Sequence, residues 1–435
     1  MSCKRAIEPA DRLSVCIENY PDKICLHYQI DQEFSGSLEL RTSFDLLDVD
    51  NQLIHLLGSC GAIFLAQLCL AQRIDINLPS ASELLTYLNP TIRTLYAVRA
   101  YRDAIRPIPE PVFNFLVPGQ PWQLQHFTSN RRAILLWSGG LDSTLSYVLL
   151  THNGYDVIPL HVSYINIDAA KSELQAVERL SGLLSTGFEV VEVRFDQFLD
   201  IATRYSAKAR EYPDINSVPH GRELLLLPVA LMCASRFGGS NICFGFENST
   251  WTEEFEYEGQ RYSRYDTQSE FCNINLQNVI RRFVSADVSL FSPLAPITEY
   301  RKFRIMATRF PELTRNASFC YWGRSCGECS KCALYYLFQR SLGLEVIQFE
   351  HNPIIERSSF ILQAMENWNK PTSRDSNFAL AQIVAHGDIR TGEDLLLEYQ
   401  HSIYPQVEPL LDEWRANLMA THTVALLPSG FTIPF

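Results

Sequence analysis

The sequence predicts an α/β protein with a mostly parallel sheet at its centre, a small α+β region before it and a helical region after it. Between residues 133 and 246, apolar runs of strand length alternate with helical segments, and this alternation is typical of a parallel sheet with helices on both faces. Shorter alternating runs precede this region, and helical periodicity follows it. A chain of 435 residues has room for two or three domains.

The first region, residues 1–115, is predicted to be a small α+β domain. Runs such as LSVCIENY and ICLHYQI between residues 13 and 47 alternate apolar and polar residues, which favours a small antiparallel sheet. Helical spacing follows to about residue 105, with Ser80 as the expected N-cap of a helix beginning near ELLTYL. The most apolar stretch, AIFLAQLCLA at 62–71, is too short to cross a bilayer and contains Gln67, so we expect a buried helix there.

The central domain is predicted to span residues 133–344. Prolines between Ile105 and Arg132 predict an extended connection before it, with 116–132 as the linker. A strand at 133–137, a helix to about residue 151 and a strand at 157–164 make a βαβ unit. Further helices and strands follow as ELQAVERLSGLL, EVVEVRF, ELLLLPVALMCASRF and NICFGF. Residues 345–435 are expected to form a helical C-terminal extension.

The composition excludes several classes of partner. The chain has 37 Lys and Arg against 49 Asp and Glu, a formal net charge of −12, so long-range attraction gathers neither nucleic acid nor an anionic membrane around it. The N-terminal residues lack the apolar core of a secretory signal, and we expect a cytoplasmic protein. In that compartment clustered cysteines more often bind metal than form disulfides.

The turn in LLWSGGLDSTLSYVLL, residues 135–150, carries the first functional prediction. A strand that ends in Ser-Gly-Gly-Leu-Asp-Ser and continues into a helix directs successive backbone N–H groups at an anion. Gly139 and Gly140 let phosphate oxygens approach the main chain, and Ser138, Ser143 and Thr144 add hydroxyl donors. No lysine follows the glycines, so this is not the phosphate loop of kinases and GTPases.

Asp142 is unexpected in an anion site. We expect it to orient the loop, to cap the helix or to bind a Mg²⁺ ion that accompanies the phosphates. A capped glycine turn without a ligand is the alternative, and the flanking strand and helix favour phosphate binding. His161 and Tyr164 end the second strand, where such sheets bind ligands. The predicted nucleotide site consists of Leu136, Trp137, Ser138, Gly139, Gly140, Leu141, Asp142, Ser143, Thr144 and His161.

Four cysteines lie close together in NASFCYWGRSCGECSKCALYYL: Cys320, Cys326, Cys329 and Cys332. Two consecutive C-x2-C spacings let thiolates converge on one tetrahedral ion, and Cys320 can close the shell. Since a closed four-thiolate shell leaves no position for substrate, we expect a structural Zn²⁺. An iron–sulfur cluster uses the same ligands and stays open, as do a chance cluster and a reactive thiol pair.

The SGGxDS turn resembles the signature of the PP-loop ATP pyrophosphatases. This resemblance implies a HUP-like, adenine nucleotide alpha hydrolase-like core, ATP as cofactor, and cleavage of ATP between its α- and β-phosphates with transfer of AMP to a carboxylate or carbonyl oxygen. Together with the four cysteines, the turn resembles the QueC family of 7-cyano-7-deazaguanine synthases over about residues 132–340.

Two stretches near the middle of the chain resemble QueC segments and also depart from them. SVPHGRELLLLPVALMCA has Arg222 at the position of the family's arginine and Glu223 in place of an asparagine. ICFGFENS has Glu247 where an asparagine is usual. The nucleotide half of the site therefore follows the family more closely than the substrate half.

Two later stretches show the same mixture. YDTQSEF keeps Asp266, Glu270 and Phe271 of a QueC motif without its Cys and Arg. SPLAPITEYRKF has Glu299 in place of a lysine. Two basic residues follow it closely, Arg301 and Lys302.

The resemblance implies that the carboxylate of 7-carboxy-7-deazaguanine is activated as an adenylate, which an amine attacks, while the amides of residues 139–143 hold the pyrophosphate. The catalytic residues expected on this basis are Asp142, Ser143, Arg222 and Lys302, with Arg301 as an alternative to Lys302. The substrate-binding residues expected are Arg222, Phe246, Glu247, Asp266 and Glu270, with Phe271 and Trp251 as further stacking candidates.

The residues outside 132–340 suggest a second comparison. With these additions the chain resembles the long QueC-like proteins of anti-phage defence operons, the Qat and type IV CBASS systems. This resemblance implies a ligase that passes the activated carboxylate to an amine on a partner protein. A synthase that uses ammonia is the alternative. The acidic net charge of the chain counts against a tRNA-modifying PP-loop enzyme. The intact loop from Ser138 to Ser143 counts against a non-catalytic nucleotide sensor. Whether the chain forms a homodimer stays open.

Overall fold

The computed structural model describes residues 8–46, 49–79, 82–117, 122–127, 130–164, 168–206, 221–320 and 325–435. The expected cap Ser80 lies outside these residues. The strands are β1 (Arg12–Asn19), β2 (Lys23–Ile30), β3 (Phe34–Thr42), β4 (Arg73–Pro79), β5 (Val112–Val117), β6 (Arg132–Leu136), β7 (Asp156–Tyr164), β8 (Glu189–Phe195), β9 (Asn241–Cys243), β10 (Glu254–Tyr257), β11 (Gln260–Ser263) and β12 (Ser289–Phe291).

The helices of the described residues follow the expected alternation in the centre and dominate the C-terminal part. They are α1 (Asn51–Cys69), α2 (Ser82–Asp103), α3 (Leu141–His152), α4 (Asp168–Leu184), α5 (Phe198–Tyr205), α7 (Glu223–Phe237), α8 (Asn248–Thr252), α9 (Glu270–Phe283), α10 (Glu299–Arg309), α11 (Pro311–Asn316), α12 (Ser330–Ser341), α13 (Ser359–Glu366), α14 (Arg374–Ala385), α15 (Asp394–Ser402), α16 (Tyr404–Val407) and α17 (Leu411–Met419).

In the described part of the chain, ten strands form one sheet in the order β12-β9-β6-β7-β8-β3-β2-β1-β4-β5. The strands from β12 to β8 run parallel to one another, which confirms the parallel-sheet fold predicted from the sequence. Loops follow the carboxyl ends of these parallel strands, and such folds bind ligands at this edge of the sheet.

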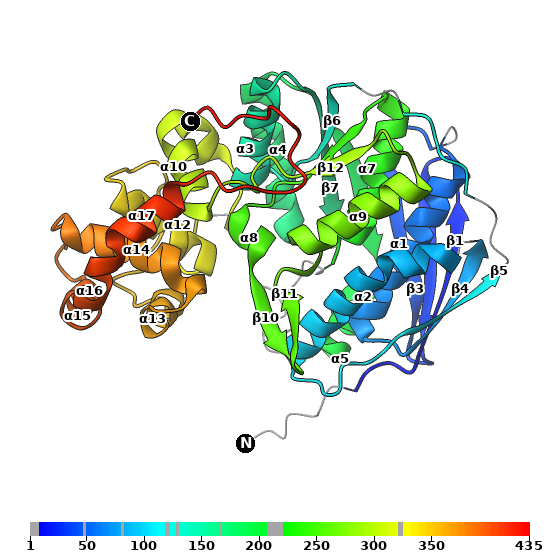
Figure 1. Ribbon diagram of the computed structural model, residues 1–435, viewed down its shortest axis with the longest axis horizontal. Helices are drawn as coiled ribbons and strands as arrows, with labels where there is room; N and C mark the ends of the chain where they lie inside the picture. The colour runs from blue at the N-terminus through cyan, green and yellow to red at the C-terminus, as the bar shows by residue number, and fades with distance from the viewer. Residues whose placement is uncertain are drawn as a thin grey trace.

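The N-terminal strands extend this central sheet rather than form a sheet of their own. β3 pairs antiparallel with β8 and sets Leu38 and Leu40 opposite Phe195 and Val193, and all four side chains belong to one apolar core. The proline-rich connection also contributes, because β5 lies within it and pairs with β4 at the sheet edge (Figure 1). The expected boundaries at 115 and 132 therefore fall within one continuous sheet.

The apolar stretch at 62–71 lies in α1, the helix expected to be buried. By length and composition α1 is long and apolar enough to cross a membrane, yet 89% of its most apolar window is buried inside the fold. It packs against α7 and the N-terminal strands. Asp50 caps its first turn by accepting a hydrogen bond from the amide of Gln52 at 2.8 Å. α1 is therefore a core helix.

The C-terminal extension is helical, as expected. Figure 1 shows α13 to α17 gathered at one end of the molecule, with the final residues crossing back over the central region. One apolar core joins these helices to α3, α10 and α12. In the returning tail, Phe431 contacts the Phe291 ring at a centroid distance of 6.0 Å. The extension therefore shares its core with the elements that carry the SGGxDS turn and the cysteines.

Candidate functional site

A cavity of about 400 Å³ lies at the carboxyl ends of β6, β7 and β9. This is the position at which doubly wound sheets bind ligands. The residues that line it come from the SGGxDS turn and from the later stretches that resemble QueC segments, among others. They are Leu136, Trp137, Ser138, Asp142, Ser143, Leu160, Val162, Tyr164, Glu173, Arg222, Glu223, Leu226, Phe244, Gly245, Phe246, Glu247, Thr250, Gln268, Glu299 and Lys331.

The SGGxDS turn forms one wall of this cavity. Gly139 has φ +73°, a left-handed conformation that glycine adopts without strain. Gly140 is the N-cap residue of α3 and has no side chain to bind the first-turn amides. These amides therefore stay available to an anion. The hydroxyl oxygens of Ser138 and Ser143 lie 3.3 Å apart beside it.

Another chain segment packs tightly against this turn. A Cβ atom at Gly245 would lie 3.1 Å from the backbone of Asp142 and Ser143, so a larger residue would push the segment after β9 away from the turn. This contact brings the residues that follow Gly245 next to the phosphate-binding turn.

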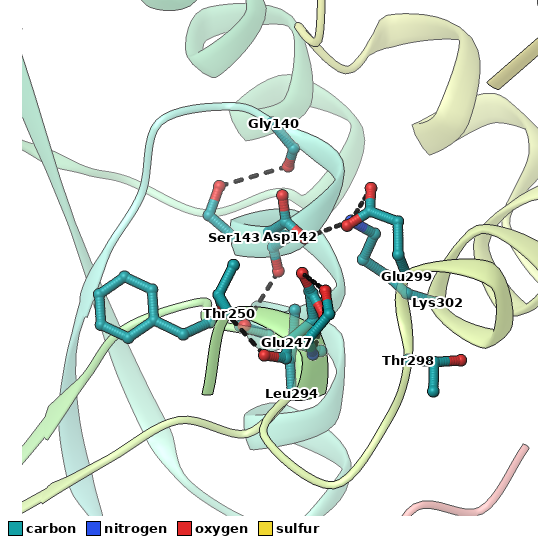
Figure 2. Close-up of polar contacts among 12 residues, drawn as sticks. Gly140, Asp142, Ser143, Glu247, Thr250, Leu294, Thr298, Glu299 and Lys302 are labelled. Atoms are coloured by element: carbon teal, nitrogen blue, oxygen red, sulfur yellow. Dashed lines mark hydrogen bonds and ion pairs between the residues drawn. The ribbon is translucent and has the colours of Figure 1, made fainter. Parts of the chain in front are cut away.

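Asp142 binds a buried lysine. The Lys302 ammonium donates a hydrogen bond to Asp142 and forms an ion pair with Glu299 Oε1 at 2.8 Å (Figure 2). Burial alone would lower the pKa of Lys302, but the two carboxylates raise it, so the ammonium stays charged. Of the three roles expected for Asp142, this contact supports that of orienting the loop.

Glu299 gathers two cations and a phenol on one oxygen. Besides Lys302, its Oε1 accepts hydrogen bonds from Lys331 Nζ at 3.2 Å and from Tyr335 Oη at 2.7 Å. Burial would raise the pKa of Glu299, but the two ammonium groups outweigh it and hold that pKa far below the usual range. Glu299 is therefore a permanent anion that fixes α10 against α12.

Glu247 lies in the segment after β9 and begins the short helix α8. Its carboxylate accepts hydrogen bonds from the amide and the hydroxyl of Ser249, both at 2.6 Å. Burial first, and then the charge of Glu299, raise the pKa of Glu247 to about 8. This cavity wall therefore carries a buried acid that takes up a proton near neutral pH.

The other end of the cavity is charged as well. The Arg222 guanidinium lies 3.9 Å from the Glu223 carboxylate, and Glu173 and Gln268 line the same end. Burial raises the pKa of Glu173. The hydroxyl of Tyr164 and the indole N–H of Trp137, two further lining residues, are buried without a hydrogen-bond partner among the described residues, which fits a polar ligand in this cavity.

Several predicted nucleotide-site residues support the turn from behind. Leu141 and Thr144, both in the first turn of α3, have buried side chains. His161 is also fully buried, and its Nδ1 lies 3.1 Å from the Trp137 carbonyl, to which it donates because a carbonyl only accepts. Burial lowers the pKa of His161, so the ring is neutral and positions the Trp137 backbone.

The four cysteines converge. All four Sγ atoms lie within 4.8 Å of one another, with Cys320 to Cys326 at 3.5 Å and Cys326 to Cys332 at 3.8 Å. A tetrahedral zinc ion with Zn–S bonds near 2.3 Å requires sulfur separations of about 3.8 Å. Amides of Glu328 and Cys329 each donate to Cys326 Sγ at 3.4 Å, which favours the thiolate. The group is compatible with a structural zinc ion.

The cysteine site and the cavity are connected through the chain. Lys331 lies between two of the cysteines and pairs with Glu299. Two residues before Cys320, the amide of Ser318 donates to the Gly139 carbonyl at 2.8 Å. The cysteine segment therefore holds both a cationic wall residue and the SGGxDS turn in place.

Residues 132–341 match the family model described as "Queuosine biosynthesis protein QueC". They form a QueC domain. A 7-cyano-7-deazaguanine synthase from Methanothrix thermoacetophila is 29% identical over 217 residues, which cover 46% of this chain and 90% of that protein. A protein of the same name from Polynucleobacter asymbioticus is 26% identical over 221 residues, which cover 46% of this chain and 85% of that protein. The family places this domain among the PP-loop proteins.

Three of the residues expected to bind or act on the substrate lie away from the cavity. Glu270 is absent from the lining of the cavity in the QueC domain, because its Oε1 accepts a hydrogen bond from the amide of Ala425 in the C-terminal tail at 2.9 Å. Phe271 is 48% exposed. Arg301 also binds the tail, through the Ala420 carbonyl at 2.9 Å. The side chain of Trp251 lies outside the described residues.

Asp266 lies behind the cavity wall rather than on it. It is buried and accepts a hydrogen bond from the amide of Thr267 at 2.6 Å. The neighbouring Thr267 hydroxyl contacts Glu223 at 2.5 Å, so Asp266 supports a lining residue. By contrast Arg222, Phe246 and Glu247 line the cavity as expected.

The sequence did not single out several lining residues of the QueC domain. Glu173 comes from α4, Gln268 from the turn before α9 and Lys331 from the cysteine segment. Lys331 could have been found, because it stands inside a metal-binding motif that must lie near the loop. Glu173 and Gln268 give no such signal in a single sequence.

Proposed function

We propose that the protein is an AMP-forming, ATP-dependent ligase that activates the carboxylate of 7-carboxy-7-deazaguanine and transfers it to an amine. The observation that carries this proposal is the cavity in the QueC domain, which joins an uncapped helix N-terminus at the SGGxDS turn to a second, charged end containing Arg222. The two ends supply what the two substrates need, a site for phosphates and a site for a polar, anionic ring compound.

The first step is attack of the substrate carboxylate on the α-phosphorus of ATP. One carboxylate oxygen forms the new bond to phosphorus, and the bond between the α-phosphorus and the bridging oxygen breaks, so that pyrophosphate leaves with the electron pair. The amides at the start of α3 and the hydroxyls of Ser138 and Ser143 bind the departing charge. Arg222 fits a role in binding the carboxylate of the substrate, since a guanidinium is suited to that shape.

A magnesium ion fits this site only in part. Asp142 carries the Lys302 ammonium on Oδ1, while its Oδ2 has no partner among the described residues, and the side chain is 37% exposed. That oxygen offers one ligand for an ion accompanying the phosphates. Lys302 already supplies a fixed positive charge at this position.

We further propose that the amine belongs to a partner protein in an anti-phage defence system. The support is indirect: the acidic groups beside the loop, Glu247 and Glu299, suit a cationic acceptor, and residues outside 132–341 extend the QueC domain at both ends. The alternative is a 7-cyano-7-deazaguanine synthase that uses ammonia, and the name shared by the two similar proteins supports it.

An experiment with intact-mass detection separates these two functions. The purified protein is incubated with ATP, 7-carboxy-7-deazaguanine and either ammonium chloride or the protein encoded beside it. The proposal predicts AMP together with a mass increase on the partner equal to the substrate less one water. A free nitrile and no adduct on any neighbouring protein would establish the synthase instead.

A further inference from the structure

The side of the cavity next to the SGGxDS turn has more acids than bases. Three carboxylates and two ammonium groups interact there: Asp142, Glu247, Glu299, Lys302 and Lys331. Lys302 is shared between Asp142 and Glu299, and Lys331 also pairs with Glu299. Among the described residues, Glu247 therefore has no salt bridge of its own. A buried carboxylate without a cation destabilises the folded protein, unless a ligand supplies the cation.

Glu247 is held rigidly at the cavity wall. Phe246, the residue before it, donates its amide to Ser292 Oγ at 2.9 Å, and the Ser292 hydroxyl donates to the Phe246 carbonyl at 2.7 Å. Asn248, the residue after it, donates its amide to the Ile297 carbonyl at 2.8 Å. The backbone on both sides of Glu247 is therefore fixed, and the two hydrogen bonds from Ser249 hold the carboxylate itself.

Capping of α8 does not require this residue. Asp, Asn and Ser are the side chains preferred at an N-cap, whereas the longer Glu247 reaches Ser249 from a position only 5% exposed. Ser249 supplies two donors, while an ionised carboxylate has about four acceptor positions. Acceptor capacity remains for a ligand. The second oxygen of Glu299 likewise has no partner among the described residues.

We propose that Glu247, with Glu299 beside it, forms the subsite that receives the acceptor amine and removes its first proton. This inference rests on the proposed function, because it requires an acyl adenylate in the same cavity. An amine arrives from water as an ammonium ion, and its charge stabilises the ionised form of Glu247, so that the acid gives up its own proton to solvent as the ammonium binds. The ligand of this subsite is therefore ammonium or a primary amine, not a hydroxyl or a thiol.

The chemical step balances without a further reactant. The ammonium gives one proton to Glu247, and the freed lone pair of nitrogen forms a bond to the acyl carbon. The bond between that carbon and the AMP oxygen breaks, and AMP leaves with the electron pair. The second proton on nitrogen passes to solvent, which yields the amide. Glu247 then releases its proton to solvent and is ready for another turnover.

Two half-reactions test this subsite in the full-length protein. Carboxylate-dependent exchange of pyrophosphate into ATP reports activation and needs no amine, whereas amide formation with methylamine or ammonium chloride reports the acceptor step. For Glu247→Gln we expect amide formation to fall about 10²-fold more than exchange, as is usual when a general base is lost. The main loss should be in use of the amine, with a raised KM for methylamine.

Two further variants separate charge from capping. Glu247→Asp keeps the charge and is a better N-cap, so it should recover part of the amine use that Glu247→Gln loses. Glu254→Gln, at an exposed position on β10, should behave like the unaltered protein. Equal loss of both half-reactions in Glu247→Gln, or an unchanged KM for methylamine, would overturn the subsite. No carboxylate-dependent exchange in the unaltered protein would instead overturn the proposed function, and this inference with it.

Discussion

Lys302 connects the phosphate-binding turn to the rest of the site. Its side chain is fully buried, and its ammonium is shared by Asp142 on α3 and Glu299 on α10. Lys302 is absent from the cavity lining, but its charge, fixed between two carboxylates behind the wall, adds positive potential near the turn without reorganising when ATP binds. One side chain therefore both holds the loop in place and supplies positive potential.

Replacing Lys302 by methionine should damage stability and activity together. Removing one partner of a buried ion pair leaves the other charges unpaired and costs about 3–5 kcal/mol, and we expect AMP formation to fall by about 10²-fold or more. Urea unfolding and AMP release measure the two effects. Arg304→Met, at an exposed position two residues further along α10, is the control and should change neither. Normal turnover in a folded Lys302→Met protein would contradict this role.

At single residues, local motifs could be interpreted from the sequence and distant contacts could not. The residues 138–143 and the four cysteines are close in sequence, and their spacing alone limits how they can be arranged. Glu270 and Arg301 were expected at the substrate but bind the C-terminal tail, more than 100 residues away in sequence. Nothing in their own neighbourhood indicates that tail.

Among the elements, α10 is the helix whose position matters most. The C-terminal extension holds its first turn at several points: Thr298 donates its hydroxyl to the Leu418 carbonyl at 2.7 Å, and Asp375 accepts from the Tyr300 amide at 3.3 Å. Because α10 carries both Glu299 and Lys302, the extension sets the geometry of the cavity without lining it. The helical periodicity after residue 345 predicted these helices but not the element they hold.

Stability should depend on pH through Asp375. Burial first, and then Glu299, raise the pKa of Asp375 to about 7, above the value of about 4 in an unfolded chain. The folded state thus binds this proton more tightly, so the contribution is complete below about pH 4 and is lost as the pH rises through 7. Asp375→Asn keeps an acceptor for the Tyr300 amide and should be more stable than the unaltered protein at pH 8, by about 1 kcal/mol. Melting temperatures at pH 5 and pH 8 measure this. An identical pH dependence in both proteins would rule out Asp375 as the cause.

The cysteine site should act on the cavity through α12. Cys329 is the N-cap of α12 and accepts a hydrogen bond from the Cys332 amide, two residues before Lys331. In Cys329→Ser we expect less bound zinc and a lower melting temperature, with activity falling in step with stability because the metal holds structure rather than substrate. Metal analysis and thermal unfolding provide the measurements. Cys16→Ser, outside the cluster, should retain full zinc content. Full zinc content in Cys329→Ser would remove this thiol from the ligand set.

At the scale of the whole molecule, the two ends of the chain complete the QueC domain. The N-terminal strands extend its sheet, with α1 packed on α7 behind Arg222 and Glu223, and the C-terminal helices support α10. The sequence predicted the type of each region, because hydrophobic periodicity is a local property. It could not predict the pairing of β3 with β8, since that contact joins segments about 150 residues apart and depends on tertiary packing.

We propose above all that this cavity cleaves ATP at the α-phosphorus on behalf of a carboxylate. This cleavage is tested most directly by measuring AMP, ADP and pyrophosphate release in the presence of ammonium chloride, with and without 7-carboxy-7-deazaguanine, for the unaltered protein and for Ser138→Ala. We expect AMP and pyrophosphate in equal amounts, only when the carboxylate is present, and the loss of both in a folded Ser138→Ala protein. Release of ADP and phosphate, or AMP formation that does not depend on the carboxylate, would contradict it.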